Sequence, residues 1–320
     1  MGGEKRMNRN FLFLTLVALT AACQAQSAQD ALESACVALP AQVCYKPEVD
    51  VQNDNYVDAR KRFHTKLLRM GPAPQDWVPL KPPPGVTEVK YTSGALQLKA
   101  WVNRPARADH RGYPAVLFLH GGYAFDLSDW LVSQPYRDAG FVVLAPMLRG
   151  ENGQPGLYTM YYDEVDDVVH AAEYLRSQPY VDASHVYVAG PSVGGTMTML
   201  AAMTYPHFRA AAAFSGSPDQ VLFINRAPGA RELVPFDLSD PRESQMRSPL
   251  AYAASLKCPL RIYYGSEEPN LSLTSRRMAE LARAHNLDVQ ALQVTGNHVT
   301  HVPESIRMSI VFFRKVEKTP

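Results

Sequence analysis

Short apolar runs alternate with amphipathic stretches along most of the chain from residue 86 onward. The first two runs alternate with period two and meet through Ser93-Gly94, which predicts an opening β-hairpin. Later runs are continuously apolar, as expected for strands that are buried on both faces of a sheet. The predicted strands lie at 86–91, 96–102, 115–119, 141–145, 185–189, 210–214, 260–264 and 289–294.

Helical stretches separate these strands. In the stretch 163–177, Val165, Val168, Val169, Ala172 and Leu175 form the stripe of an amphipathic helix. Strands that are regularly separated by helices imply right-handed crossovers and a mostly parallel sheet. We therefore predict an α/β fold with a sheet of about eight strands and helices on both faces. The other predicted helices lie at 56–70, 130–139, 194–204, 274–285 and 304–315.

Two regions depart from this rhythm. Residues 24–84 are polar and carry prolines at 72, 74, 79 and 82–84, which predicts an extended strap and no separate domain. Residues 216–256 contain five prolines and predict a small cap inserted beside the carboxyl edge of the sheet, where open α/β sheets bind ligands. The predicted organisation is a signal peptide (1–22), a leader and strap (23–84) and one catalytic domain (85–320).

Composition narrows the function classes. The 320 residues are 46% hydrophobic and 20% charged, which is enough apolar material for one large core. The 32 basic and 31 acidic side chains nearly cancel, so nothing indicates a nucleic-acid partner.

The N-terminus predicts export. Basic residues precede an uncharged run at 11–22, which is too short for a good bilayer span of about 20 residues. The ending Leu19-Thr20-Ala21-Ala22-Cys23 resembles the lipobox of bacterial lipoproteins, which would make Cys23 the lipidated first residue. Ordinary signal-peptidase cleavage within 22–28 is the alternative. We expect the protein to be exported from a bacterial cytoplasm and lipid-anchored in the cell envelope, or otherwise periplasmic or secreted.

The expected state of the other cysteines depends on this export. Cys36 and Cys44 lie eight residues apart in a segment broken by Pro40, and outside the cytosol such a pair is expected to form a disulfide. The alternative is two unpaired thiols. Cys258 begins an apolar run and is expected to be a small buried hydrophobe. No Cys/His spacing indicates a zinc site, and no cofactor is expected.

The motif that carries chemistry is Gly190-Pro191-Ser192-Val193-Gly194, a G-x-S-x-G sequence between a predicted strand and a predicted helix. The glycines allow a turn sharp enough to expose the Ser192 hydroxyl. A phosphate loop would need a lysine, and a dinucleotide fingerprint would need glycine in place of the serine.

Partners for Ser192 follow at the ends of other strands. His120-Gly121-Gly122-Tyr123 stands where hydrolases present an oxyanion donor, which would be the N–H of Gly122 or Tyr123 beside that of Val193. Downstream, Glu267-Glu268 follows one strand and His298 follows the next. The order of serine, acid and histidine is that of a nucleophilic triad.

From these residues the chain resembles the α/β-hydrolase family, and in particular its prolyl oligopeptidase-like and dienelactone hydrolase-like branch. The resemblance covers 86–315 and includes the Arg149-Gly150 loop and Pro179-Tyr180-Val181-Asp182. It implies Ser192 as nucleophile, His298 as general base and Glu268 as acid, in a frame where the family more often has Asp. Glu267 remains an alternative acid.

Several of these residues have alternative roles. His301 competes with His298, and the one that is not the base is expected to be a surface or wall histidine. His120 is expected to pack behind its loop. The acidic run 163–167 is interpreted as a solvated helix face, and Tyr158, Tyr161 and Tyr162 as packing residues.

The predicted function is that of a serine hydrolase that cleaves an ester or a peptide bond through an acyl-enzyme. The resemblance includes peptidases that usually carry a large β-propeller, and the short leader cannot encode one. An esterase acting on a small-molecule substrate is therefore preferred, with a prolyl oligopeptidase-type peptidase of short peptides as the alternative. A non-catalytic binding lipoprotein with a vestigial triad is the alternative of another class.

Overall fold

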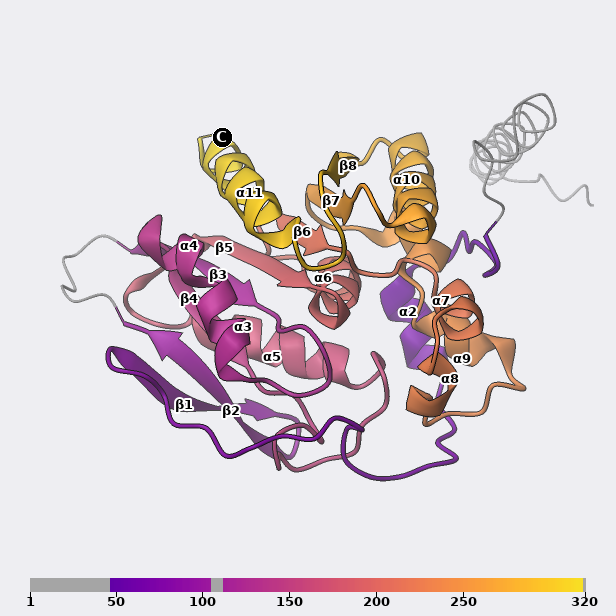
Figure 1. Cartoon of the computed structure of the whole chain (residues 1–320), viewed down its shortest axis with the longest axis horizontal. Coiled ribbons are helices and arrows are strands. Elements are labelled where there is room, and N and C mark those ends of the chain that lie inside the picture. The colour runs from indigo at the N-terminus through magenta and orange to yellow at the C-terminus, as the bar shows by residue number, and fades with distance from the viewer. Residues whose placement is uncertain (1–46, 105–111, 319–320) are drawn as a thin grey trace, which may run out of the picture. The chain divides into compact units, whose positions relative to one another are not determined.

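The computed structural model describes residues 47–104 and 112–318, and a sheet of eight strands runs through this part of the chain (Figure 1). The strands follow the order β1-β2-β4-β3-β5-β6-β7-β8. The strands β3 to β8 pair in parallel, whereas β1 and β2 pair antiparallel with each other and β2 with β4. This confirms the predicted α/β fold. The strands are β1 (Val86–Ser93), β2 (Leu96–Asn103), β3 (Tyr113–Phe118), β4 (Val142–Pro146), β5 (Val181–Pro191), β6 (Ala211–Phe214), β7 (Leu260–Gly265) and β8 (Val289–Val294).

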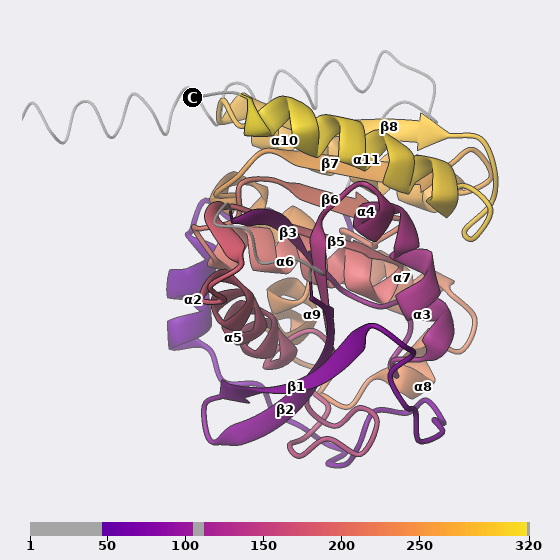
Figure 2. The same ribbon diagram turned by 90° about the vertical axis from the view of Figure 1, so that its left-hand side faces the viewer.

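Helices cover both faces of the sheet. The helices α5 and α6 pack on one face, and α4 and α11 pack on the other. Figure 2 shows α5 and α3 on opposite sides of the strands β3 and β5. The main helices are α3 (Leu127–Val132), α4 (Gln134–Asp138), α5 (Glu164–Arg176), α6 (Val193–Thr204), α10 (Pro269–Ala284) and α11 (Val302–Glu317).

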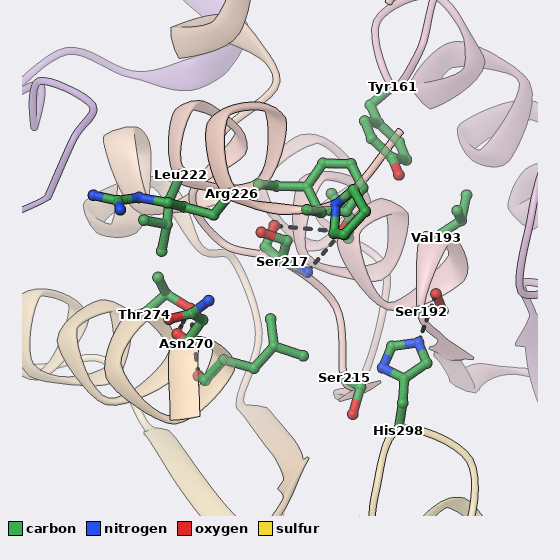
Figure 3. Close-up of a pocket in the computed structure, with 15 residues that line it drawn as sticks. Tyr161, Ser192, Val193, Ser215, Ser217, Leu222, Arg226, Asn270, Thr274 and His298 are labelled. Atoms are coloured by element: carbon green, nitrogen blue, oxygen red, sulfur yellow. Dashed lines mark hydrogen bonds between the residues drawn. The ribbon is translucent and has the colours of Figure 1, made fainter. Parts of the chain in front are cut away.

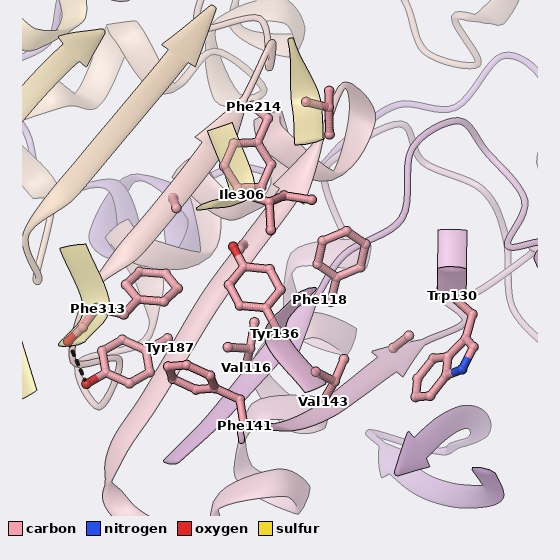
Figure 4. Close-up of a cluster of buried hydrophobic side chains, with 14 of the residues drawn as sticks. Val116, Phe118, Trp130, Tyr136, Phe141, Val143, Tyr187, Phe214, Ile306 and Phe313 are labelled. Atoms are coloured by element: carbon pink, nitrogen blue, oxygen red, sulfur yellow. Dashed lines mark hydrogen bonds between the residues drawn. The ribbon is translucent and has the colours of Figure 1, made fainter. Parts of the chain in front are cut away.

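Aromatic side chains fill the layer between the sheet and the helices α3, α4 and α11 (Figure 4). Phe313 of α11 is fully buried and stacks on Tyr187 of β5, with ring centroids 4.4 Å apart. Tyr136 of α4 lies against the same phenylalanine and shares a 2.6 Å hydrogen bond with Ser309. Burying rings of this size supplies a large part of the hydrophobic stabilisation.

Two predicted helices differ from the structure. The helix predicted at 130–139 is divided into α3 and α4, because the first helix ends at its C-cap Ser133 and a new one begins at Gln134 with Pro135 in its first turn. The helix predicted at 56–70 is α2 (Tyr56–Arg62), which ends eight residues early. Beyond it the chain contacts the cap region, where Leu67 forms a bridge with Phe236 and the N–H of Lys66 donates to Glu243. These tertiary contacts outweigh the helical pattern.

The region for which the sequence predicts a cap forms short helices beside the carboxyl ends of the strands. They are α7 (Gln220–Arg226), α8 (Ala230–Leu233), α9 (Pro241–Met246) and the 3-10 helix η1 (Pro249–Ser255). The strap packs against this region, since Tyr56 is fully buried and its hydroxyl donates to the carbonyl of Met246 at 3.1 Å. Among the helices of the described residues, none has the length and apolarity to cross a bilayer.

Candidate active site

Ser192 occupies a strained turn between β5 and α6. Its backbone has φ +52° and ψ −116°, a conformation that a non-glycine residue adopts only under constraint. Both glycines of the motif are sterically required, because a Cβ on Gly190 or Gly194 would lie within 2.4 Å of the carbonyl oxygen of Leu119. The turn therefore exposes the Ser192 hydroxyl at the carboxyl edge of the sheet.

The structure places His298 and Glu268 beside this serine. The Nε2 of His298 lies 3.0 Å from the Oγ of Ser192, and its Nδ1 lies 2.6 Å from the Oε1 of Glu268. Figure 3 shows the imidazole beneath Ser192. Glu267, the alternative acid, is exposed, and the two ring nitrogens of His298 contact Glu268 and Ser192 instead. The geometry is that of a nucleophile, a base and an acid in one hydrogen-bonded line.

The second oxygen of the Glu268 carboxylate accepts two hydrogen bonds from neighbouring residues. Its Oε2 accepts the N–H of Gly265 at 2.6 Å and the hydroxyl of Ser215 at 2.5 Å. Burial raises the pKa of Glu268, but the hydrogen bonds from His298, Ser215 and Gly265 outweigh burial and lower it. The carboxylate is therefore ionised and fixed in orientation at neutral pH.

His301 is neither exposed nor part of the pocket wall, so the expectation of a surface or wall histidine is wrong. It is fully buried, and its Nε2 lies 2.6 Å from the Oγ of Ser215 and 3.5 Å from the Oε2 of Glu268. Its Nδ1 lies 2.8 Å from the Oγ of Ser305. His301 is the N-cap residue of α11, and its buried partners are polar side chains.

Ser215 and its contact with Glu268 are absent from the sequence predictions. The available signal was its place immediately after β6, because the carboxyl ends of parallel strands meet at the same edge. Its φ of +48° is a second unusual backbone conformation at this edge.

Two backbone N–H groups of the predicted oxyanion hole have no hydrogen-bond partner among the described residues. Val193 is the first residue of α6, so its N–H has no intrahelical partner. Gly122 has φ +71°, and its N–H has no hydrogen-bond partner within the described residues. The N–H of Tyr123 instead donates to the Oε1 of Gln75 at 2.7 Å. Of the two donors that the sequence left open, the geometry favours Gly122.

Gln75 belongs to the strap, and no pattern in the sequence marks it. Its amide nitrogen also donates to the carbonyl of Ala124 at 3.5 Å, so one side chain bonds the backbone of two consecutive residues in the loop. The neighbouring Ala73 donates its N–H to the carbonyl of Gly150 at 2.9 Å. The strap thus braces the loop of residues 120–125, which we call the oxyanion loop.

His120 lies behind the oxyanion loop, as predicted from its place before two glycines. It is 3% exposed, and its Nε2 lies 2.9 Å from the Oε2 of the equally buried Glu151. Burial lowers the pKa of His120, but the charge and hydrogen bond of Glu151, with smaller contributions from Asp129 and Gly121, raise it to about 9. The pair joins the oxyanion loop to the loop that follows β4.

A cavity of about 350 Å³ opens beside Ser192 and His298. Leu222, Phe223 and Pro228 of the cap form much of its apolar wall, while Arg226 lies at the end away from Ser192 (Figure 3). Tyr161 also lines it, with φ +68° and a 3.0 Å hydrogen bond to the hydroxyl of Tyr123. No Asp or Glu side chain is among the described residues that line this cavity.

Tyr158 and Tyr162 pack elsewhere, as predicted. Tyr158 lies edge-on to Tyr123 with ring centroids 5.3 Å apart, and the Tyr162 hydroxyl donates to the carbonyl of Phe63 at 2.7 Å. Tyr161 is the exception, because it lines the cavity.

The acidic run 163–167 is only partly a solvated face. Asp167 is fully buried and pairs with Arg149 at 2.7 Å, and Glu164 is 3% exposed and accepts the N–H of Thr159 at 2.6 Å. Burial raises the pKa of Glu164 to about 7. These carboxylates stabilise loops, which is why they do not all face solvent.

The cysteines divide between described and undescribed parts of the chain. Cys258 is a free, partly exposed thiol, and burial of its sulfur raises its pKa to about 12. Cys23, Cys36 and Cys44 lie outside the described residues, as do the signal peptide and most of the leader. Within the described ranges no group of three His, Cys, Asp or Glu side chains is arranged to hold a metal ion.

The sequence of this chain is similar to those of known peptidases and related enzymes. A sequence profile described as the prolyl oligopeptidase family matches residues 127–309, more than half of the chain. The uncharacterised peptidase YtmA of Bacillus subtilis is 25% identical over 201 residues, which are 59% of this chain and 76% of that protein. The human acylamino-acid-releasing enzyme is 29% identical over 211 residues, which are 59% of this chain and 28% of that enzyme.

Solved structures agree in fold. A puromycin-hydrolyzing peptidase of Mycobacterium tuberculosis superposes with a TM-score of 0.65 at 21% identity, covering 75% of this chain and 41% of that one. An acylaminoacyl peptidase of Pyrococcus horikoshii gives a TM-score of 0.59 at 21% identity, covering 72% and 41%. This chain therefore spans about two fifths of the length of these structures, and between 18% and 76% of the curated relatives that lead the sequence comparison.

Proposed function

Because the chain belongs to the prolyl oligopeptidase family of serine hydrolases, with the α/β-hydrolase fold, we propose that it is a peptidase that hydrolyses short peptides or blocked aminoacyl amides. The observation that carries the proposal is the hydrogen-bonded line from Ser192 through His298 to Glu268 at the edge of the sheet. The sequence-based preference for an esterase has no support among the relatives named above, which are named as peptidases or as an acylamino-acid-releasing enzyme.

In the proposed mechanism, His298 takes the proton of Ser192 as the hydroxyl attacks the carbonyl carbon of the substrate. Glu268 holds the imidazole in the tautomer with its proton on Nδ1 and stabilises the imidazolium that forms. The N–H groups of Val193 and Gly122 hold the developing oxyanion, and each such donor is typically worth about 3 kcal/mol in the barrier. His298 then protonates the leaving amine and activates the water that releases the acyl group.

The cavity supports a small acyl part without a positive charge. Its volume of about 350 Å³ lies at the small end of the range for ligand pockets, so it suits a short segment and not a folded protein. A free α-ammonium would enter without a carboxylate partner in the lining, and burying an unpaired charge is costly. A blocked amino terminus avoids this cost.

The first test is labelling by a fluorophosphonate probe, which reacts with activated serines. We expect wild-type protein to be labelled and Ser192→Ala to be silent, while Ser177→Ala, a change at an exposed serine at the C-terminus of α5, behaves as wild type. Wild-type protein without labelling would favour the non-catalytic binding lipoprotein.

The second test separates the substrate classes. N-acetyl-aminoacyl p-nitroanilides, the same amides without the acetyl group, and proline amides are compared with p-nitrophenyl esters by kcat/KM. Faster turnover of the blocked amides than of the free-amine amides supports the proposal. Turnover of the esters without turnover of any amide would overturn it and restore the esterase.

A further inference from the structure

Two buried polar side chains beside the triad have no role in the mechanism above. Ser215 is 4% exposed at the end of β6, and His301 is fully buried at the start of α11. Both contact the Oε2 of Glu268, whereas His298 contacts its Oε1, and they come from segments 86 residues apart in the chain. A buried polar group is costly unless its hydrogen bonds are made, so their arrangement calls for a physical reason.

The proton positions along this line follow from what each group can donate. An ionised carboxylate only accepts, so the hydroxyl of Ser215 donates its proton to the Oε2 of Glu268. The Oγ of Ser215 must then accept at its other contact, and the donor is the Nε2–H of His301. A neutral imidazole with this proton has a lone pair on Nδ1, which accepts the hydroxyl proton of Ser305.

The surroundings keep His301 neutral. Among the described residues, the titratable groups that act on it are Glu268, whose charge raises its pKa, and His298, whose charge lowers it. Burial, opposed in part by the charge of Glu268, lowers the pKa of His301. A neutral imidazole is the form that the hydrogen-bond assignment requires.

We propose that His301 and Ser215 are positioning residues, which form a relay that fixes the Glu268 carboxylate from behind and thereby orients His298 toward Ser192. The inference rests on the proposed serine hydrolase function. The relay also explains why residue 268 is a glutamate. A longer side chain than the Asp that is more common in this frame carries the carboxylate to Ser215 and His301 while its other oxygen still binds His298.

The discriminating variants change His301, because it lies outside the substrate cavity. His301→Leu removes the donor to Ser215, whereas His301→Gln retains an N–H at a similar reach. Ser309→Ala is the matched control, because Ser309 is a fully buried serine on the same helix that bonds Tyr136 and not the triad. It reports the effect of losing a buried hydrogen bond of α11 without touching Glu268.

We expect His301→Leu to slow fluorophosphonate labelling and to lower kcat about tenfold with KM unchanged, since hydrogen bonds to charged groups are among the stronger ones. His301→Gln should recover most of this loss, and Ser309→Ala should label at the wild-type rate. The double variant Ser215→Ala/His301→Leu should be no slower than the slower single variant, because the two residues act as one relay.

A spectroscopic readout tests the relay without any substrate. The proton on the Nδ1 of His298, shared with Glu268, gives a low-field NMR signal that we expect to move in His301→Leu and to stay in place in Ser309→Ala. If His301→Leu does not fold, Ser305→Ala removes only the donor to the Nδ1 of His301 and should move the same signal to a smaller extent.

Wild-type labelling together with an unmoved His298 signal in the His301 and Ser305 variants would overturn the relay. Equal losses of activity in His301→Leu and Ser309→Ala would also overturn it, because they would show a structural role alone. If the wild-type protein itself is not labelled, the proposed function fails, and the NMR signal still decides the relay.

Discussion

The buried pair of His120 and Glu151 makes the stability of the protein depend on pH in a way that can be calculated. In the folded protein the pKa of His120 is raised to about 9, against an ordinary value of 6.5. A group with a raised folded pKa stabilises the fold fully below the unfolded pKa, and this contribution is lost as the pH rises through the folded pKa. At 1.36 kcal/mol per unit, the pair contributes about 3 kcal/mol below pH 6.5 that disappears between pH 6.5 and about 9.

The perturbation that isolates this contribution is Glu151→Gln. Without the carboxylate, burial lowers the pKa of His120 and only the smaller contributions of Asp129 and Gly121 oppose it, so the variant should lose much less than this 3 kcal/mol on alkaline titration. Glu173→Gln removes one acid from an exposed position and serves as the control for net charge.

Urea denaturation at pH 6 and pH 9.5 measures the free energy of unfolding of all three proteins. We expect the wild type and the control to lose about 3 kcal/mol more than Glu151→Gln over this interval, other titrating groups being common to them. A difference of less than about 1 kcal/mol would refute the reasoning, because His120 would then not be held protonated by its partner.

Three further predictions concern the site and the core. Glu268→Gln should lower kcat by about a thousandfold or more, while Glu267→Gln should stay within about twofold of wild type, as measured by turnover of the best amide substrate. Comparable losses in both would show that the acid is misassigned. Gln75→Leu should lower kcat about tenfold with little change in KM, because the oxyanion loop loses its brace, and an unchanged kcat would show that the loop holds its shape without it. Phe313→Ala should cost about 3–5 kcal/mol in urea denaturation, since it leaves a cavity against Tyr187, and a cost under about 1 kcal/mol would contradict the packing described.

Short-range patterns predicted most of the sheet and the nucleophile. The hairpin of β1 and β2, the buried strands and the helix α5 follow from periodicity within a few residues. The turn around Ser192 was equally predictable, because the G-x-S-x-G pattern lies between a strand and a helix. In the structure, its two glycines leave room for the carbonyl oxygen of Leu119, just after β3. Helix boundaries were less predictable. The helix α2 ends at Arg62 because the following residues bind the cap, which no local pattern reports.

By itself, the sequence determined the α/β order, the strand-turn-helix position of Ser192 and the acid and histidine that follow later strands. Only the tertiary structure decided between Glu267 and Glu268, placed His301 behind the carboxylate and brought Gln75 of the strap to the oxyanion loop. The physical reason is the distance along the chain over which the deciding interactions act. Backbone periodicity and turn sterics act between near neighbours, whereas the direction of a side chain after a strand depends on which distant groups can satisfy its hydrogen bonds when the layers pack.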